Sequence, residues 1–219
     1  MTSTENASTA PSTLPADDPR TIFATAAATA GATLAAVTDD QLGLPTPCTS
    51  MTVGDLAEHL VMVTRRVASA GRDEPLDTWA IDAADVRGGG WTETFRAGAA
   101  DAAAAWSDDA TLDRPTTLPW TTCTGAEALG IYTNELTVHT WDLARATGQA
   151  PAWDPAVLAT SMEHIRRELP MAERAPMWAE AKAYLPEGIE WEDPFGDAVT
   201  VADDAPLIDR LVAWNGRTP

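Results

Sequence analysis

Both ends of a long helix are marked in the stretch from Thr124 to Gly148. Thr124 and Glu127 have the spacing of a capping box, and Gly148 follows the last apolar turn, where a glycine commonly ends a helix. At 1.5 Å per residue, such a helix is roughly 35 Å long, enough to run through a whole domain. Its inward stripe recurs at helical spacing and consists of Leu129, Tyr132, Leu136, His139 and Leu143.

Helical periodicity recurs in other parts of the chain. A second capping-box spacing, Thr52 with Asp55, opens a segment that Gly71 is expected to end, and Asp154-Pro155 has the form of a helix start. Strand signals are limited to short extended stretches between Thr111 and Thr122. We therefore predict an all-α fold, a four-helix bundle with an extra helix and a short irregular C-terminal extension. The further predicted helices cover residues 19–39, 52–71, 91–106, 154–169 and 206–214.

The 219 residues suit one domain with short appendages. Residues 1–17 are rich in Thr, Ser, Ala and Pro and predict a disordered tail, with the helical domain covering 18–219. Residues 170–219 are expected to pack on the bundle as an extension. Residues 72–90, which end in Gly88-Gly-Gly90, form a long connection that we expect to be a mobile loop.

The charge excludes several classes of function. A formal charge of −19 argues against nucleic acid as a partner, because phosphate contacts need clustered Lys and Arg. Lys182 is the only lysine, which argues against Schiff-base or P-loop chemistry. No apolar run is long enough to span a bilayer, and the first residues lack the features of a signal peptide. We therefore expect no membrane partner and a cytoplasmic location.

The two cysteines, Cys48 and Cys123, are too few and too far apart for a disulfide framework or a C-x-x-C site. Each directly precedes a predicted helix, whose N-terminus can lower the pKa of a thiol and make it reactive. A small buried free thiol is the more common situation for cysteine, and both interpretations remain open.

Two of the three histidines stand where a metal would need them. Glu135 and His139 are four residues apart, so both side chains lie on one face of the long helix. His59 lies on the apolar stripe of an earlier helix, beside Leu56 and Val63. Two imidazoles and one carboxylate from two packed helices would make a three-ligand metal site that leaves coordination positions open.

Structural interpretations compete with this one. An inward histidine is usually a hydrogen-bonded core residue, and a Glu-x-x-x-His pair is usually an exposed stabilising pair. A carboxylate on an apolar stripe, however, needs a partner, and a cation is a suitable one. Asp142 is equally consistent with a hydrogen-bond acceptor for an imidazole and with an ordinary surface acid. Glu163 and His164 are interpreted as surface residues.

Three segments resemble the mycothiol-dependent maleylpyruvate isomerase family of the DinB-like superfamily. Residues 46–60 (TPCTSMTVGDLAEHL) resemble the opening of its second helix, and residues 134–148 (NELTVHTWDLARATG) resemble its second metal-binding segment. Residues 195–219 resemble the tail of a subgroup described as metal-binding proteins. The resemblance covers most of residues 20–219 and implies a DinB-like bundle with a divalent metal held by His59, Glu135 and His139. Since only about seventy residues follow the long helix, we expect the isomerase's separate C-terminal domain to be absent.

The resemblance also implies zinc as the metal and a low-molecular-weight thiol such as mycothiol as a co-substrate. We predict an enzyme that activates this thiol for transfer to an electrophilic substrate or for isomerisation, with no catalytic residue beyond the metal ligands. The ligand set also suits Fe²⁺ or Ni²⁺. The alternatives are a zinc-hydroxide hydrolase and a non-catalytic metal-binding or sensor module. A homodimer is consistent with the family likeness.

Overall fold

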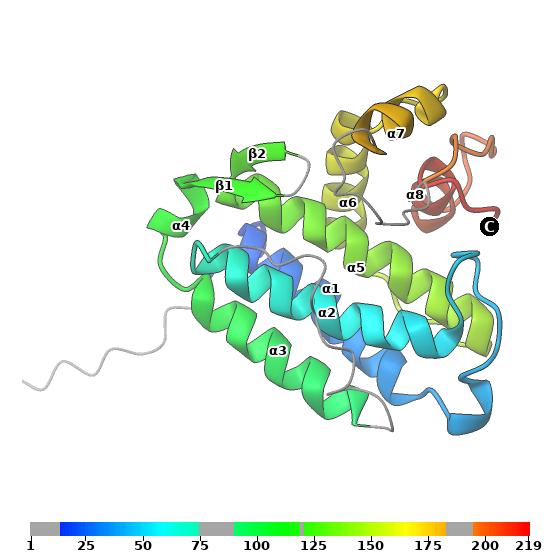
Figure 1. Cartoon of the computed structure of the whole chain (residues 1–219), viewed down its shortest axis with the longest axis horizontal. Coiled ribbons are helices and arrows are strands. Elements are labelled where there is room, and N and C mark those ends of the chain that lie inside the picture. The colour runs from blue at the N-terminus through cyan, green and yellow to red at the C-terminus, as the bar shows by residue number, and fades with distance from the viewer. Residues whose placement is uncertain (1–13, 75–89, 119–120, 183–194) are drawn as a thin grey trace, which may run out of the picture.

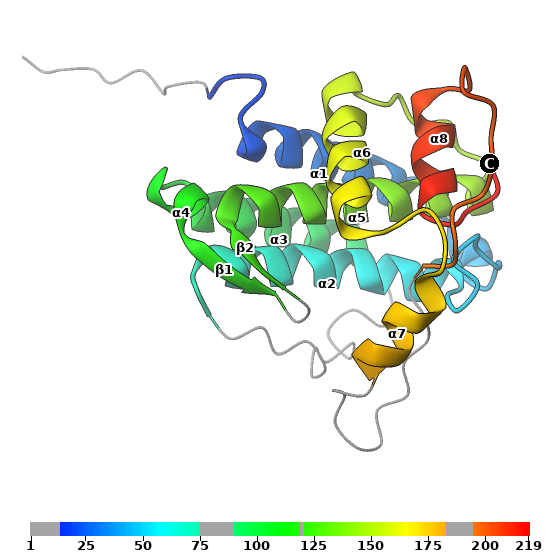
Figure 2. The same ribbon diagram turned by 90° about the horizontal axis from the view of Figure 1, so that it is seen from above.

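A computed structural model describes residues 14–74, 90–118, 121–182 and 195–219. The predictions for residues 1–13 and for most of the 72–90 connection, with its Gly88-Gly-Gly90 run, lie outside the described residues. The four helices of the bundle are α1 (Pro19–Ala35), α2 (Val53–Gly71), α3 (Trp91–Ala105) and α5 (Gly125–Thr147). They lie side by side, with α2 packed on α3 and α5, and α1 packed on α3 and α5 (Figures 1 and 2).

The remaining elements are short. A 3₁₀ turn, η1 (Asp39–Gln41), follows α1, and α4 (Ala110–Asp113) leads into a hairpin of β1 (Pro115–Leu118) and β2 (Thr121–Thr124). The strands pair antiparallel, with Pro115 opposite Thr124 and Leu118 opposite Thr121. After the bundle come α6 (Pro155–Glu168), α7 (Arg174–Lys182) and α8 (Leu207–Trp214). The predicted all-α class is confirmed, and the predicted extended stretch is this brief hairpin.

The helix ends follow the capping signals. Thr52 and Thr124 each accept a hydrogen bond from the backbone of the residue three positions on, and the acids at those positions bond back, so both capping boxes are formed. Asp154 caps α6 ahead of Pro155, and Gly148 ends α5 in the left-handed conformation. These local hydrogen bonds satisfy backbone groups that a helix end leaves unpaired, which is why the sequence located these ends correctly.

One predicted helix end was wrong. α1 ends at Ala35 and not near Asp39, because alanine favours helix without marking where it stops. α2 ends at Gly71 as predicted, and this glycine is also needed for packing, since a Cβ there would lie 2.8 Å from Trp106 Nε1. α7 forms within the C-terminal extension that was predicted to be irregular. Pro176 does not prevent it, because a proline in the first turn removes no intrahelical hydrogen bond.

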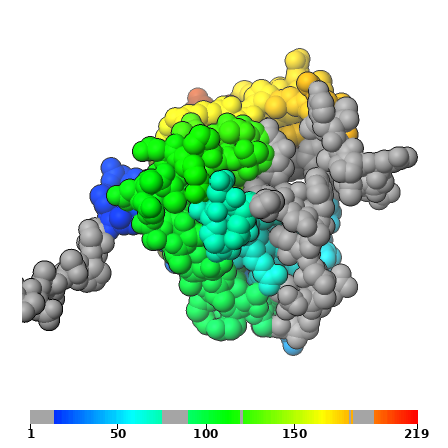
Figure 3. Space-filling model, turned by 60° about the vertical axis from the view of Figure 1, so that its left-hand side comes forward, coloured from blue at the N-terminus to red at the C-terminus, as the bar shows by residue number. Residues whose placement is uncertain are grey.

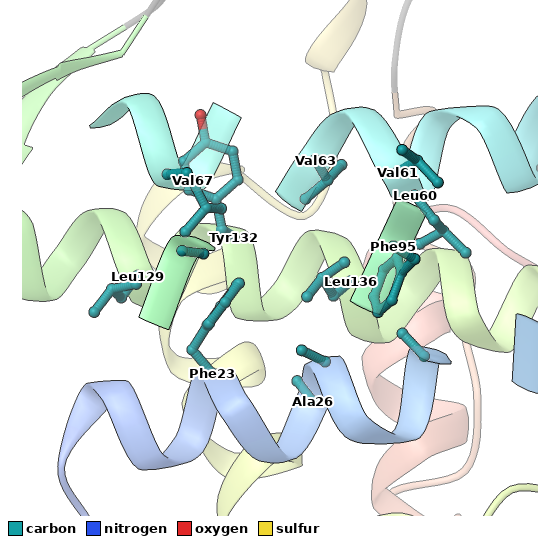
Figure 4. Close-up of a cluster of buried hydrophobic side chains, with 14 of the residues drawn as sticks. Phe23, Ala26, Leu60, Val61, Val63, Val67, Phe95, Leu129, Tyr132 and Leu136 are labelled. Atoms are coloured by element: carbon teal, nitrogen blue, oxygen red, sulfur yellow. The ribbon is translucent and has the colours of Figure 1, made fainter. Parts of the chain in front are cut away.

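The main core lies between α1, α2, α3 and α5. Apolar side chains from all four helices point into this space, among them Phe23, Leu60, Phe95 and Leu136 (Figure 4). A second, smaller core joins α5 to α6 and α8 and includes Val138, Ile165 and Leu211. No helix among the described residues is long and apolar enough to cross a membrane. The second core places the C-terminal residues against the middle of α5.

Glycine lets α2 and α3 approach closely. The end of α2 is visible between the atoms of α3 and the hairpin in Figure 3. Along this contact, a Cβ on Gly98 of α3 would lie 2.1 Å from Thr64 Oγ1 and 3.0 Å from Thr64 Cβ. Thr64 is fully buried and its hydroxyl donates to the Val61 carbonyl, so it has little freedom to move.

Replacement of Gly98 by alanine is therefore expected to lower the free energy of unfolding by about 1–3 kcal/mol, the usual result of overpacking a buried contact. Urea unfolding measures this change. Gly43→Ala is the matched control, because a Cβ at Gly43 would meet no atom within 4 Å. Equal free energies of unfolding for the two variants would show that the contact between α2 and α3 does not require a glycine at position 98.

Candidate metal centre

Two helices carry the three predicted ligands. His59 lies near the middle of α2, and Glu135 and His139 lie one turn apart on α5. Since α2 and α5 pack against each other, the three side chains face the same region between them. The structure brings all three together, with one candidate ligand atom from each within 4.8 Å of the others.

The contacts within this group are short. His59 Nε2 lies 3.1 Å from Glu135 Oε1, and the two imidazole centroids are 4.7 Å apart with ring planes at 77°. The side chains of His59 and Glu135 are 15% and 17% exposed, whereas that of His139 is 9% exposed. The group therefore lies at the edge of the core, where part of it reaches solvent.

The donor set fits a divalent metal. Zinc bonds of about 2.0–2.2 Å to nitrogen and oxygen place neighbouring tetrahedral ligands roughly 3.3 Å apart. The separation of 3.1 Å between His59 and Glu135 is already close to that value. Two neutral imidazoles and a carboxylate also leave one or more coordination positions free. That these residues bind a metal stays a prediction.

The protonation of the group also suits a cation. Burial opposes the charge of Glu135, but the hydrogen bond from His59, together with the His59, His139 and Arg66 charges, lowers its pKa to about 2. Burial lowers the pKa of His139, and the nearby Asp142 only partly offsets this effect. An ionised carboxylate and a neutral imidazole are the forms that ligate a metal.

The low pKa of Glu135 predicts a pH dependence of stability in the metal-free protein. A carboxylate with a lowered folded pKa stabilises the fold above its unfolded value of 4.5, and this contribution is lost as the pH falls toward the folded value of about 2. Glu135→Gln is therefore expected to be less stable than wild type at pH 6 by about 3 kcal/mol. Urea unfolding with a chelator present should show this gap narrowing as the pH falls below 4.5. A gap that is constant with pH would contradict the assignment of this charge.

Asp142 contacts the Nδ1 atom of His139. Asp142 is fully buried, and its Oδ2 lies 3.2 Å from His139 Nδ1. Burial raises the pKa of Asp142, but the contacts with His139 and Arg217 together hold it below its ordinary value. The ionised carboxylate therefore accepts the Nδ1 proton of His139 and leaves Nε2 with a free lone pair. Of the two interpretations left open by the sequence, the hydrogen-bond acceptor is the correct one.

Arg217, close to the C-terminus, completes this arrangement and was missed by sequence reasoning. Its Nη2 and Nε donate to Asp142 Oδ2 and Oδ1 at 3.0 and 3.3 Å, and its Nη1 donates to the Asn215 carbonyl at 2.7 Å. Asn215 also exchanges side-chain hydrogen bonds with Asn134 of α5. No local pattern marks Arg217, because its partner lies 75 residues earlier in the chain.

Cys48 lies beside the centre, whereas Cys123 does not belong to it. Cys48 Sγ forms a second group with His139 and Asp142, again with candidate ligand atoms within 4.8 Å of one another. Cys123 lies on β2, where its Sγ is 4.0 Å from the Thr116 carbonyl. Both thiols are half-buried and neither is paired in a disulfide.

His164 is outside the group, but its predicted surface position was only partly right. Glu163 is exposed, whereas His164 is half-buried and packs against α5. A Cβ on Gly130 would lie 2.0 Å from His164 Nε2, so this glycine lets α6 approach α5.

Comparisons with known proteins identify a family and two relatives that the chain resembles. Residues 23–144, which include all three candidate ligands, match the family described as mycothiol maleylpyruvate isomerase N-terminal domain. The chain is 30% identical over 189 residues to the uncharacterized proteins MT0763 and Rv0738 of Mycobacterium tuberculosis, strains CDC 1551 / Oshkosh and ATCC 25618 / H37Rv. Each match covers 85% of this chain and 91% of the relative. No solved structure matches the chain significantly.

The family match spans more than half of the chain, from within α1 to the last turn of α5, and covers the bundle that holds the candidate ligands. It also agrees with the resemblance found in residues 46–60 and 134–148. The chain belongs to the mycothiol maleylpyruvate isomerase N-terminal domain family, a DinB-like family.

Proposed function

We propose that His59, Glu135 and His139 hold a divalent metal ion, with zinc as the first candidate, and that the protein is an enzyme using a low-molecular-weight thiol of the mycothiol type. The observation that carries this proposal is the approach of three metal-ligating side chains from α2 and α5 to within 4.8 Å of one another. Family membership supports the thiol, because the family's own description names mycothiol.

A bound zinc ion would supply a Lewis acid that stabilises a thiolate at neutral pH. The protein's own residues would hold the ion and orient its ligands. Glu135 would carry the negative charge of the ligand set, and Asp142 keeps the proton of His139 on Nδ1, so that Nε2 is free to coordinate. The partial exposure of His59 and Glu135 leaves a path for a small molecule to reach the centre.

The reaction we propose is attack of the thiolate sulfur on an electrophilic carbon. The new carbon–sulfur bond either persists, which is S-transfer, or breaks again after a rearrangement, which is isomerisation. No protein nucleophile is needed, in keeping with the half-buried state of Cys48 and Cys123. The proposal places the protein in the cytoplasm, where low-molecular-weight thiols are kept reduced.

The test is consumption of a small electrophile by zinc-loaded protein, measured with mycothiol and without it. Maleylpyruvate is the first electrophile to examine, followed by simple activated alkenes and halides. We expect turnover that requires the thiol and is lost in His59→Ala but kept in His164→Ala. Turnover with water alone would instead indicate a zinc-hydroxide hydrolase. Stoichiometric metal without turnover of any substrate in the panel would favour a binding or sensor module.

A further inference from the structure

The thiol of Cys48 lies close to His139, which is also one of the proposed ligands of the first metal site. Cys48 belongs to the loop between η1 and α2, and this loop is fixed by its own contacts. Thr46 Oγ1 lies 2.9 Å from the Cys48 carbonyl and 2.8 Å from the Met51 carbonyl, and Pro45 forms a bridge with Thr52. These contacts hold the thiol against α5, beside His139 and Asp142.

The two nitrogens of His139 serve different neighbours. Nδ1 faces Asp142 Oδ2 at 3.2 Å and is therefore the nitrogen available on the side of Cys48 and Asp142. Since Nδ1 is engaged with Asp142, we assign Nε2 to the group formed with His59 and Glu135. A neutral imidazole carries one proton and one lone pair, so it can offer only one of its nitrogens to a metal at a time.

We propose that Cys48, His139 Nδ1 and Asp142 form a second metal-binding set, selective for thiophilic ions, that competes with the His59–Glu135–His139 set for the same imidazole. The thiolate gives this set a preference for softer ions such as Cd²⁺ or Cu⁺, whereas we expect Zn²⁺ to stay with the His59–Glu135–His139 set. Arg217 keeps the carboxylate of Asp142 ionised and in place.

Metal binding at this set releases one proton from Cys48 and moves another within His139. The ion displaces the proton of Cys48, which leaves to solvent, and forms a metal–sulfur bond. The proton on His139 Nδ1 moves to Nε2, so the imidazole stays neutral and its lone pair faces the ion. A protonated Nε2 cannot ligate, and the first set is thereby reduced to His59 and Glu135.

The ligand atoms of Cys48, His139 and Asp142 lie almost close enough to share one ion. Metal–ligand bonds of about 2.0–2.3 Å give separations of roughly 3.3–3.8 Å between ligand atoms. The three atoms now lie within 4.8 Å of one another, so a closing movement of about 1 Å is enough. Rotation of the Cys48 side chain can supply this movement, because His139 and Asp142 lie on the long helix α5.

A metal suits this thiol better than disulfide chemistry does. Burial raises the pKa of Cys48, and the charge of Arg217 only partly counters this effect. The thiol is therefore largely protonated at neutral pH and is a weak nucleophile for disulfide exchange. A thiophilic ion needs no such activation, since coordination itself removes the proton.

The test is a Cd²⁺ titration of metal-free protein, followed by the ultraviolet charge-transfer absorbance of a cadmium–thiolate bond. We expect one such bond per chain in wild type, in Cys123→Ser and in His59→Ala. Cys48→Ser should lose the absorbance, and Asp142→Asn should bind Cd²⁺ at least tenfold more weakly. Circular dichroism confirms that each variant is folded. Because His59→Ala keeps this signal, the result is independent of whether the first set works as proposed.

A second measurement tests the competition. Cd²⁺ added to the zinc-loaded protein is expected to release zinc in equal amount, detected with a zinc indicator. Absence of the thiolate absorbance in wild type would overturn the proposal, and so would its survival in Cys48→Ser with loss in Cys123→Ser. Simultaneous retention of one zinc and one cadmium ion per chain would disprove the competition for His139.

Discussion

Replacement of Arg217 by methionine is expected to lower the free energy of unfolding by about 3–5 kcal/mol, because it leaves a buried carboxylate without its cation. The side chain of Asp142 is fully buried and that of Arg217 is 5% exposed, so water cannot take the place of the guanidinium. Methionine keeps most of the volume of the arginine stem. His139 can bind a proton in response, which places the expected loss nearer the lower figure.

Urea unfolding with a chelator present measures this change without a contribution from bound metal. Arg167→Met is the matched control, because Arg167 pairs with Glu163 where both side chains are more than half exposed. Such a pair is worth about 0–1 kcal/mol. The double variant Asp142→Asn with Arg217→Met should recover part of the stability, since it removes the unpaired charge. Equal losses in Arg217→Met and Arg167→Met would show that the C-terminal residues do not support α5.

Replacement of Glu135 by glutamine is expected to weaken zinc binding at least about a hundredfold. Loss of a group that merely supports a ligand already weakens binding by about 10–100-fold, and Glu135 would be a ligand itself. Glutamine preserves the shape of the side chain and removes the one negative charge in the His59–Glu135–His139 set. The variant therefore tests the charge of the ligand set more than its packing.

Competition with a chromogenic chelator at constant pH gives the two affinities. Glu127→Gln is the matched control, since Glu127 lies on the same helix but closes the capping box with Thr124, away from the candidate ligands. Glutamine can also serve in a capping box. If Glu135→Gln and Glu127→Gln bind zinc equally well, Glu135 is not a ligand.

The parts of the fold that the sequence predicted are those with local signals. Capping residues located both ends of α5 and the starts of α2 and α6, because the relevant hydrogen bonds join residues two to four positions apart. The four-residue helix α4 has no periodicity to detect, and the end of α1 lacks a stop signal. The predicted pairing of His59 with the Glu135–His139 turn depended on one assumption, that α2 and α5 pack together.

Contacts between distant parts of the chain could not be predicted in the same way. Arg174 is fully buried and donates to the carbonyls of Pro170, Gly196 and Trp214, which ties the C-terminal residues into one unit. This unit places Arg217 on Asp142. Neither arginine belongs to a repeating pattern, and each contact depends on how separate segments pack after the helices have formed.

The metal content of purified protein tests the central claim most directly. Wild type, His59→Ala and His139→Ala are supplied with zinc, dialysed and analysed for bound metal, with His164→Ala as the control that removes the remaining histidine. Our account predicts about one ion per chain in wild type and His164→Ala, and a loss of metal in the other two variants. Wild-type levels of metal in both His59→Ala and His139→Ala would contradict it.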